Sequence, residues 1–355
     1  MAKMKLKVGV IGVGAIADER HLPYWHELEA EGRVELIGVC DIRKDRAEEM
    51  AAKYGARSVY FDYQKMLRDG QYDIIDVCTQ NRFHAPITVA ALKAGAHVLV
   101  EKPMAMNAAE CRAMIKAATS AKRRLMVAQH MRFEAPNEKL KEVIQSGRLG
   151  QVYSANATYL RRRGIPGWGK FHLRRESLGG PLIDIGVHVM DLAVWLMGCP
   201  KPIAASGKVY RKFGDRDDLC NGDWGEPYPP SEFDVEDYAS AYVRFEKDIT
   251  MTVEVSWAAN IAEERSGITI LGDKAGISTD PLGLYGYDGR SLTSTRFDWL
   301  PNQEGHRMEI RHFTECVEGK LPVRVQPAES LRIQQIIDAI YESSRRNREV
   351  PIKAV

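Results

Sequence analysis

Four groups of residues in this sequence have the types and spacing that chemistry requires, and the first is a glycine turn. Gly12-Val13-Gly14-Ala15-Ile16-Ala17 follows an apolar run and opens a helical one. In the pattern G-x-G-x-x-A the first glycine permits a tight turn, the second lets a pyrophosphate approach the backbone, and the small third residue lets helix and strand pack closely. The N–H groups and the positive dipole end of the helix favour a phosphate. Glycines are also common in buried strands, so this motif needs support from its context.

The second group is Asp41 and its neighbours. The run VELIGVC ends in Asp41, where a dinucleotide-binding fold has an acidic partner for the ribose hydroxyls. The interval from the glycines exceeds the usual ~20 residues because the helix HLPYWHELEAEG adds length. A carboxylate repels a 2′-phosphate, which favours NAD, whereas Arg43 and Lys44 keep NADP open. The alternative is that Asp41 caps a helix.

The third group, Glu101-Lys102-Pro103, ends the apolar run HVLV. The carboxyl ends of parallel strands meet at the ligand crevice of an open α/β sheet. An ammonium group there could stabilise developing alkoxide character or join a proton relay. A cis bond between Lys102 and Pro103 would fix where the lysine points. An ordinary surface ion pair between Glu101 and Lys102 is the alternative.

The fourth group lies in the apolar helix predicted for residues 179–198, which carries Asp184, His188 and Asp191. Because Asp184 and His188 are four residues apart, they share one helical face. A carboxylate beside an imidazole holds one tautomer and raises its basicity, as a proton-transferring histidine requires. Two alternatives are a structural buried histidine and a metal site Asp-x-x-x-His-x-x-Asp. We expect no metal, because nothing else in the sequence supplies a matching set of cysteine or histidine ligands.

The elements that position these groups fall into two regions. Up to about residue 128, short apolar runs alternate with helical segments, which is typical of a doubly wound α/β domain around a parallel sheet. After about residue 150, runs such as YASAYVRFE and ITMTVEVSWAAN alternate apolar with polar residues and predict an open antiparallel sheet. ESLRIQQIIDAIYESSRR predicts a closing helix, and residues 211–237 predict a long loop. We therefore expect an NAD(P)-binding Rossmann domain at 1–128 and an α/β domain at 129–355.

Composition narrows the class of protein. A length of 355 residues suits two domains, and 45% apolar with 28% charged residues suits packed, soluble ones. A net charge of +2 gives no general attraction to nucleic acid or anionic membranes, and no run approaches the ~18 apolar residues of a membrane helix. The six scattered cysteines suit reduced thiols, and the glycine-rich start suits a strand better than a signal peptide. We expect a cytoplasmic protein.

Taken in order, these motifs resemble the glucose-fructose oxidoreductase / inositol dehydrogenase / MocA (Gfo/Idh/MocA) family. The resemblance covers almost the whole chain and is carried by Gly12-x-Gly14-x-x-Ala17, Asn81-x-x-His84, Glu101-Lys102-Pro103 and Gly179-Gly180…Asp184-x-x-x-His188. The closing GHRMEIRHFTECVEGKLPVRVQP is similar to the family's penultimate segment. One departure is Gln80, where the family often has proline. The resemblance implies a Rossmann domain followed by a domain whose open, mostly antiparallel sheet commonly forms homodimers or homotetramers.

The resemblance also implies a function and a set of site residues. It implies hydride transfer between a nicotinamide cofactor and a secondary alcohol of a sugar, cyclitol or glycoside, with Lys102, Asp184 and His188 as the catalytic residues. The residues expected at the cofactor are Gly12, Gly14, Ala15, Ile16, Asp41, Ile42, Thr79, Asn81, His84, Glu101 and Lys102. Those expected at the substrate are Lys102, His130, Arg161, Trp168, Asp184 and His188.

Arg161 and Trp168 are not shared across the family. The arginine could recognise an anionic or glycosidic substrate and the indole could stack on a sugar ring, although most charge runs are solvated surfaces. Two other functions stay open: a sugar-modifying enzyme that recycles tightly bound NAD, and a non-catalytic NAD(P)-binding regulator.

Overall fold

The computed structural model describes residues 5–218 and 227–353 of the chain. It divides into two compact units, Met1–Phe133 with Gln303–Leu331, and Glu134–Asn302 with Arg332–Val355. Residues 219–226, which include Cys220 and part of the predicted loop at 211–237, lie outside the described residues. Within the described ranges no single helix is long and apolar enough to cross a membrane, although one bent pair, Arg174–Asp184 with Gly186–Leu196, passes on length and composition.

The first unit is built on the predicted parallel sheet. Its six strands lie in the order β3-β2-β1-β4-β5-β6, and every neighbouring pair is parallel. The strand order changes direction between β1 and β4, which is where open α/β sheets bind ligands beyond the carboxyl ends of their strands. The strands are β1 (Leu6–Ile11), β2 (Val34–Cys40), β3 (Ser58–Tyr60), β4 (Ile74–Val77), β5 (His97–Glu101) and β6 (Leu125–Ala128).

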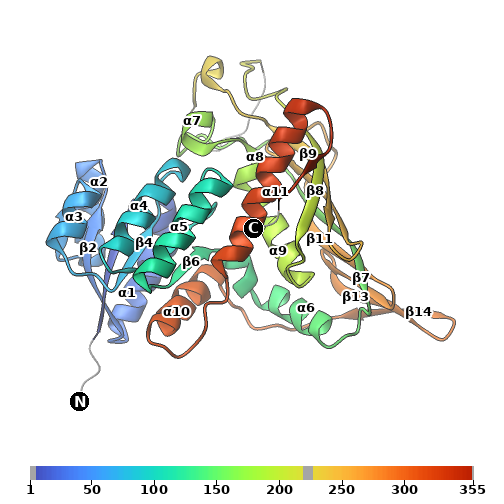
Figure 1. Ribbon diagram of the computed structural model, residues 1–355, viewed down its shortest axis with the longest axis horizontal. Coiled ribbons are helices and arrows are strands. Elements are labelled where there is room, and N and C mark those ends of the chain that lie inside the picture. Colours follow the sequence, from blue (N-terminus) through green and yellow to red (C-terminus); the bar gives the residue numbers. More distant parts are fainter. Residues whose placement is uncertain (1–4, 219–226, 354–355) are drawn as a thin grey trace. The chain divides into compact units, whose positions relative to one another are not determined.

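Helices join these strands, as the alternation of apolar runs predicts (Figure 1). Between the glycine turn and the first α-helix the chain forms a π-helical turn, η1 (Ala17–His21), and a 3₁₀ turn, η2 (His130–Phe133), follows the last strand. The α-helices are α1 (Leu22–Ala30), α2 (Lys44–Tyr54), α3 (Tyr63–Asp69), α4 (Asn81–Lys93) and α5 (Ala108–Ala121).

The boundary between the units differs from the predicted division at residue 128. The first unit runs to Phe133 and also takes residues 303–331, which contain α10 (Gly305–Val317). Ile310 and Phe313 of this helix are fully buried in the same core as the strands of the first sheet. Helix α10 therefore packs in the core of the first unit, although it follows most of the second unit in the sequence.

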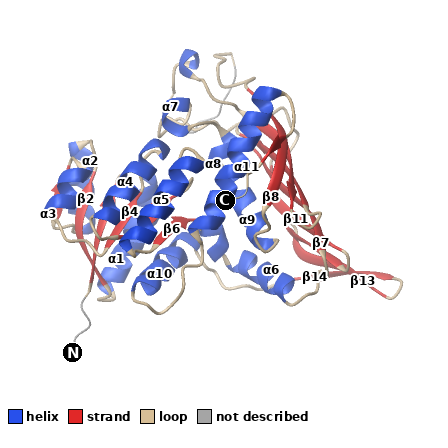
Figure 2. Ribbon diagram, viewed as in Figure 1, coloured by secondary structure: helices blue, strands red, loops and turns tan. Residues whose placement is uncertain are grey.

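The second unit contains the expected open, mostly antiparallel sheet (Figure 2). Its nine strands lie in the order β14-β13-β12-β11-β7-β10-β9-β8-β15, and only the β7–β10 pair is parallel among the pairs described. The strands are β7 (Val152–Leu160), β8 (Pro202–Tyr210), β9 (Tyr238–Phe245), β10 (Thr250–Ser256), β11 (Arg265–Gly272), β12 (Ala275–Thr279), β13 (Leu282–Asp288), β14 (Ser291–Arg296) and β15 (Val350–Pro351).

One face of this sheet is covered by the buried helix α9, which contacts β7, β10 and β11. Burial alternates along strands such as β10, as the apolar–polar pattern predicts. The helices outside the first unit are α6 (Ala135–Gln145), α7 (Arg174–Ser177), α8 (Pro181–Asp184), α9 (Gly186–Leu196) and the short η3 (Pro230–Glu232), and α11 (Pro327–Arg346) runs across the boundary at Leu331.

Candidate active site

The glycine turn has the geometry that a phosphate cradle needs. Gly12 has φ of +87°, and a Cβ there would lie 2.7 Å from the Cys78 carbonyl oxygen, so only glycine fits. A Cβ on Gly14 would meet no heavy atom within 4 Å, which leaves the backbone open to a ligand. Ala15 and Ile16 are exposed, whereas Ala17, the small third residue, is fully buried. These features fit the pyrophosphate of a dinucleotide.

Asp41 is tied to this turn. Its carboxylate accepts hydrogen bonds from the backbone N–H groups of Val13 at 3.1 Å and Arg43 at 2.9 Å. Helix α2 begins after Arg43, which supplies no side-chain cap, so Asp41 supports the glycine turn as well as the start of the helix. Ile42, predicted to face the cofactor, is 83% exposed. The acidic residue at the end of β2 is therefore placed beside the turn, as an acidic partner of the ribose requires.

The loop after β4 lies against the same turn. A Cβ on Gly12 would also meet the Thr79 methyl group at 2.7 Å, so Thr79 borders the glycine turn. Asn81 is buried as the first residue of α4. The ring of His84, another residue predicted at the cofactor, is fully buried, with Nδ1 2.7 Å from the Pro103 carbonyl and Nε2 2.9 Å from the Thr79 carbonyl. These contacts join the loop after β4 to the loop after β5.

The Glu101-Lys102-Pro103 segment closes this edge of the sheet. The Lys102–Pro103 bond is cis, as predicted. Glu101 is 5% exposed, and its Oε2 accepts a hydrogen bond from the Lys102 backbone N–H at 2.9 Å. Its Oε1 lies 2.9 Å from Nε2 of His21. Burial favours the neutral acid, but the contact with His21 holds the pKa of Glu101 at about 2. Glu101 is therefore a buried, ionised carboxylate and not a surface one.

His21 was not among the predicted residues. It lies in η1, where a π-helical turn changes which side chains face the sheet, and its ring is fully buried between Glu101 and Asp76. The sequence does contain one indication that a buried partner such as His21 exists, because Asp76 is a charged residue within the apolar strand β4.

The helix predicted at 179–198 is two helices in the structure. Helix α8 ends at Asp184, α9 begins at Gly186, and the axis bends by 48° between Arg174–Asp184 and Gly186–Leu196. Ile185 keeps right-handed helical angles of φ −100° and ψ −28°, so Asp184 and His188 remain one turn apart.

Gly179 and Gly180 lie against Tyr341 and Glu236 of the second unit. A Cβ on Gly179 would lie 1.9 Å from the Tyr341 hydroxyl, and one on Gly180 would lie 1.9 Å from the Glu236 carbonyl oxygen. The Glu236 carboxylate accepts hydrogen bonds from the Tyr341 hydroxyl at 2.8 Å and the Leu182 N–H at 3.3 Å. The glycines therefore allow α8 to start directly on Glu236, which sets the position of Asp184.

Asp184 and His188 have different surroundings. Asp184 is 7% exposed, and its Oδ2 accepts a hydrogen bond at 3.0 Å from Nε1 of the fully buried Trp257. His188 is only half-buried, although the residues on either side of it in α9 are buried. The carboxylate is thus fixed by the core of the second unit, while the imidazole reaches a more open position. This is the difference expected between an orienting group and a proton-transferring group.

The predicted substrate residues are placed separately. The Arg161 guanidinium lies over the Tyr159 ring at 5.1 Å and donates to the Gly164 carbonyl at 3.3 Å, and Trp168 is 43% exposed. In the first unit, the His130 ring stacks on that of His306 with centroids 4.0 Å apart. Burial, with His306 acting in the same direction, lowers the pKa of His130 to about 3, so His130 is neutral at physiological pH.

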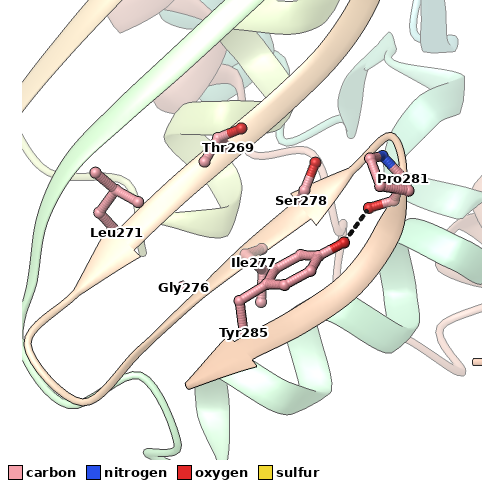
Figure 3. A pocket seen from close by; sticks show the side chains of 7 residues that line it. All are labelled: Thr269, Leu271, Gly276, Ile277, Ser278, Pro281 and Tyr285. Carbon is pink, nitrogen blue, oxygen red and sulfur yellow. Dashed lines mark hydrogen bonds between the residues drawn. The ribbon is translucent and has the colours of Figure 1, made fainter. Parts of the chain in front are cut away.

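A surface hollow of about 480 Å³ lies elsewhere, on β11, β12 and β13 (Figure 3). It is almost entirely apolar, and the Tyr285 hydroxyl at its edge donates to the Pro281 carbonyl at 3.1 Å. None of the candidate site residues lines it, and its lining contains no carboxylate, histidine or lysine. The lining residues are Thr269, Leu271, Gly276, Ile277, Ser278, Pro281 and Tyr285.

Comparison with known proteins identifies the family of the chain. Residues 6–129 match the family model described as "Oxidoreductase family, NAD-binding Rossmann fold", and residues 137–278 match the GFO/IDH/MocA C-terminal domain. The chain is 34% identical over 354 residues to D-glucoside 3-dehydrogenase of Escherichia coli, covering 99% of both chains. It is 30% identical over 196 residues, 55% of each chain, to inositol 2-dehydrogenase of Salmonella typhimurium.

Solved structures share the fold. Levoglucosan dehydrogenase in complex with NADH and levoglucosan superposes with a TM-score of 0.82 at 23% identity, covering 99% of this chain and 100% of that one. An oxidoreductase domain protein from Kribbella flavida has a TM-score of 0.84, also at 23% identity, with coverage of 99% and 100%. Since both halves of the chain match and the glycine turn has the form that NAD requires, this protein belongs to the Gfo/Idh/MocA family of NAD-binding oxidoreductases.

Proposed function

We propose that this protein is an NAD-dependent dehydrogenase that oxidises a secondary hydroxyl of a sugar ring, with D-glucosides as its first substrate class. The observation that carries the substrate class is the 34% identity to D-glucoside 3-dehydrogenase over 99% of both chains. The match to inositol 2-dehydrogenase covers only 55% of this chain, so the glucoside enzyme is the more complete relative.

The first unit holds the cofactor in this proposal. The backbone at Gly12 and Gly14 would receive the pyrophosphate, because a Cβ on Gly14 would point into open space. Asp41 would accept hydrogen bonds from the ribose hydroxyls, with Thr79 and Asn81 on the neighbouring loop. When bound, NAD accepts the hydride from the substrate carbon.

Side chains of this protein would accept the substrate's proton and stabilise the negative charge that develops on its oxygen. Loss of hydride from a carbinol carbon leaves a hydroxyl proton that must be removed, and we assign His188 to accept it. Asp184, fixed by Trp257 at 3.0 Å, would orient the imidazole and stabilise its charged form. Lys102 would donate a hydrogen bond to the substrate oxygen and stabilise its negative charge.

The first experiment is a substrate panel. A methyl D-glucoside, an inositol, an aldose and levoglucosan would be incubated with the protein and either NAD or NADP, and the absorbance of reduced nicotinamide followed. The proposal expects the glucoside with NAD to give the highest kcat/KM. If the sugar is converted while no reduced nicotinamide accumulates, the protein recycles its cofactor. If NAD binds but no sugar or cyclitol reacts, the protein is a non-catalytic NAD-binding regulator.

The second experiment tests the residue roles. Lys102→Ala and His188→Ala should each lower kcat by at least ~100-fold, the low end for a lost proton-transfer group. Lys93→Ala and His26→Ala are matched controls, because both residues are exposed on helices of the first unit, and neither should change kcat appreciably. Normal turnover by both site variants, with NAD affinity intact, would refute the assignment.

A further inference from the structure

A buried charge cluster lies beside Lys102 and has no role in the mechanism above. The His21 ring, which is fully buried, has Nδ1 2.8 Å from Asp76 Oδ2 and Nε2 2.9 Å from Glu101 Oε1. Trp25 Nε1 donates to the same Asp76 oxygen at 2.7 Å. The three elements concerned, η1, β4 and β5, all end or begin at the ligand edge of the first sheet.

The two carboxylate contacts of His21 determine how many protons its ring carries. An ionised carboxylate only accepts hydrogen bonds, and a neutral imidazole donates from only one of its nitrogens. A ring held between two carboxylates at these distances makes both contacts only when both nitrogens carry a proton. Burial acts against this charged form, but Asp76 and its neighbours hold the pKa of His21 well above its ordinary value. His21 is therefore an imidazolium at neutral pH.

The groups facing the ring are consistent with that charge. Burial and the negative charge of Glu101 raise the pKa of Glu309, on α10, well above its ordinary value, so Glu309 is neutral. Burial and Asp76 likewise raise the pKa of the Cys78 thiol, which lies 3.5 Å from Asp76 Oδ1. The His306 ring meets His21 edge to face at 6.2 Å. Two carboxylates thus face one imidazolium, with neutral acids around them.

The contact reaches Lys102 through one more hydrogen bond. Glu101 uses Oε1 for His21 and Oε2 for the backbone N–H of Lys102, at 2.9 Å each. We propose that His21 is a positioning residue: by donating from both ring nitrogens it fixes Glu101 against β4, and through Glu101 it fixes the backbone of Lys102. The catalytic consequence rests on the proposed function, because it matters for turnover only if the Lys102 ammonium contacts the substrate.

A matched pair of variants separates this role from simple packing. An asparagine amide reaches about as far as Nδ1 and a glutamine amide about as far as Nε2, so His21→Asn keeps the donor to Asp76 and His21→Gln keeps the donor to Glu101. We expect kcat to fall about 10- to 100-fold in His21→Asn, as for a reacting group displaced by ~1 Å, and only a few-fold in His21→Gln. Equal losses in the two variants at similar thermal stability would overturn the proposal.

Two measurements need no substrate. In protein labelled with ¹⁵N-histidine, the His21 signals can be identified by their loss in His21→Asn. They should show both ring nitrogens protonated at pH 7, and a singly protonated ring overturns the proposal. Hydrogen exchange at the Lys102 amide should be at least ~10-fold faster in His21→Asn than in His21→Gln, because the first variant loses the hold on Glu101. Equal exchange overturns it. A wild-type protein that oxidises no sugar but passes both measurements would refute the proposed function and leave the His21 contact standing.

Discussion

Substitution of Gly14 by alanine should separate folding from cofactor binding. A Cβ at Gly14 would have no heavy atom within 4 Å, and Gly14 does not have the positive φ that favours glycine. The methyl group therefore fits the protein, and the alanine narrows the conformations of the unfolded chain. The free energy of unfolding should stay the same or rise by about 0.4–1 kcal/mol.

The same methyl group should weaken NAD binding, because the second glycine of the turn is where a pyrophosphate comes closest to the backbone. If the methyl group costs one hydrogen bond from a backbone N–H to a charged phosphate oxygen, the loss is about 1.5–3 kcal/mol. Such a loss raises the Kd for NAD about 10- to 150-fold.

Gly12→Ala is the contrasting variant, because we expect it to lower the stability of the fold itself. The position has φ of +87°, and the new Cβ would lie 2.7 Å from both the Cys78 carbonyl oxygen and the Thr79 methyl group. A left-handed conformation costs a non-glycine residue about 1–2 kcal/mol, and overpacking a tight contact adds about 1–3 kcal/mol. The free energy of unfolding should therefore fall by about 2–5 kcal/mol in the absence of any ligand.

The two properties are measured on the same preparations. Isothermal titration calorimetry gives the Kd for NAD, and urea unfolding followed by circular dichroism gives the stability of the protein without cofactor. The reasoning is refuted if Gly14→Ala binds NAD as tightly as the wild type. It is also refuted if Gly14→Ala loses as much stability as Gly12→Ala, because the open space above Gly14 would then be filled by the protein itself.

Two further predictions concern charge. Asp41→Asn removes the negative charge and keeps an oxygen acceptor for only one of the two N–H groups, of Val13 and Arg43, that bond to separate carboxylate oxygens. Arg43 Nε lies 3.6 Å from the Asp41 carboxylate. In Asp41→Asn the ratio of kcat/KM for NAD to that for NADP should fall at least ~10-fold, the equivalent of about 1.4 kcal/mol. Asp45→Asn is the control. An unchanged ratio in Asp41→Asn would show that Asp41 does not select the cofactor. The second prediction concerns His97, whose pKa is lowered to about 4 by burial and by Arg123 and Arg124. Because the unfolded chain takes up this proton near pH 6.5 and the folded chain only near pH 4, stability due to His97 is complete above pH 6.5 and is lost as the pH falls to 4. In the wild type the Arg124 N–H donates to His97 Nδ1 at 2.8 Å, and His97→Asn can keep an acceptor for it. In urea titrations, the free energy of unfolding of this variant should fall less steeply between pH 6.5 and pH 4 than that of the wild type. An identical dependence on pH contradicts the assignment.

The first sheet and its strand-end residues could be predicted because the signals are local. Each parallel strand is a short apolar run, and four of the candidate cofactor residues lie one or two positions after the end of such a strand. Gly12 after β1, Asp41 after β2, Thr79 after β4 and Lys102 after β5 all lie at the carboxyl edge that strand order and parallel pairing define. Periodicity was therefore enough to place Gly12, Asp41 and Lys102 at one edge of one sheet, whereas Thr79, two residues after β4, was expected from the resemblance.

Features that depend on distant contacts could not be predicted in this way. The return of α10 to the first unit depends on Ile310 and Phe313 matching a core built from residues some two hundred positions earlier. The start of α8 depends on Tyr341 and the buried Glu236, which meet Gly179 and Gly180 from elements far along the chain. An apolar pattern of helical period contains neither partner, so it predicted one continuous helix.

The buried charges form a third case, in which the sequence held a signal of a different kind. Asp76 stands in the apolar run IIDV, and a carboxylate buried in a parallel strand is costly unless it is paired. Its partner had to come from a neighbouring element, and the π-helical turn at Ala17–His21 directs His21 inward to meet it. A helix of regular period would assign inward positions differently, which is why His21 was missed while Asp76 was visible. A charged residue that interrupts a buried strand should therefore be treated as half of a pair, and the search for the other half directed to the turn that leads into the adjoining helix. Here that search leads from Asp76 through His21 to Glu101, the residue that holds Lys102.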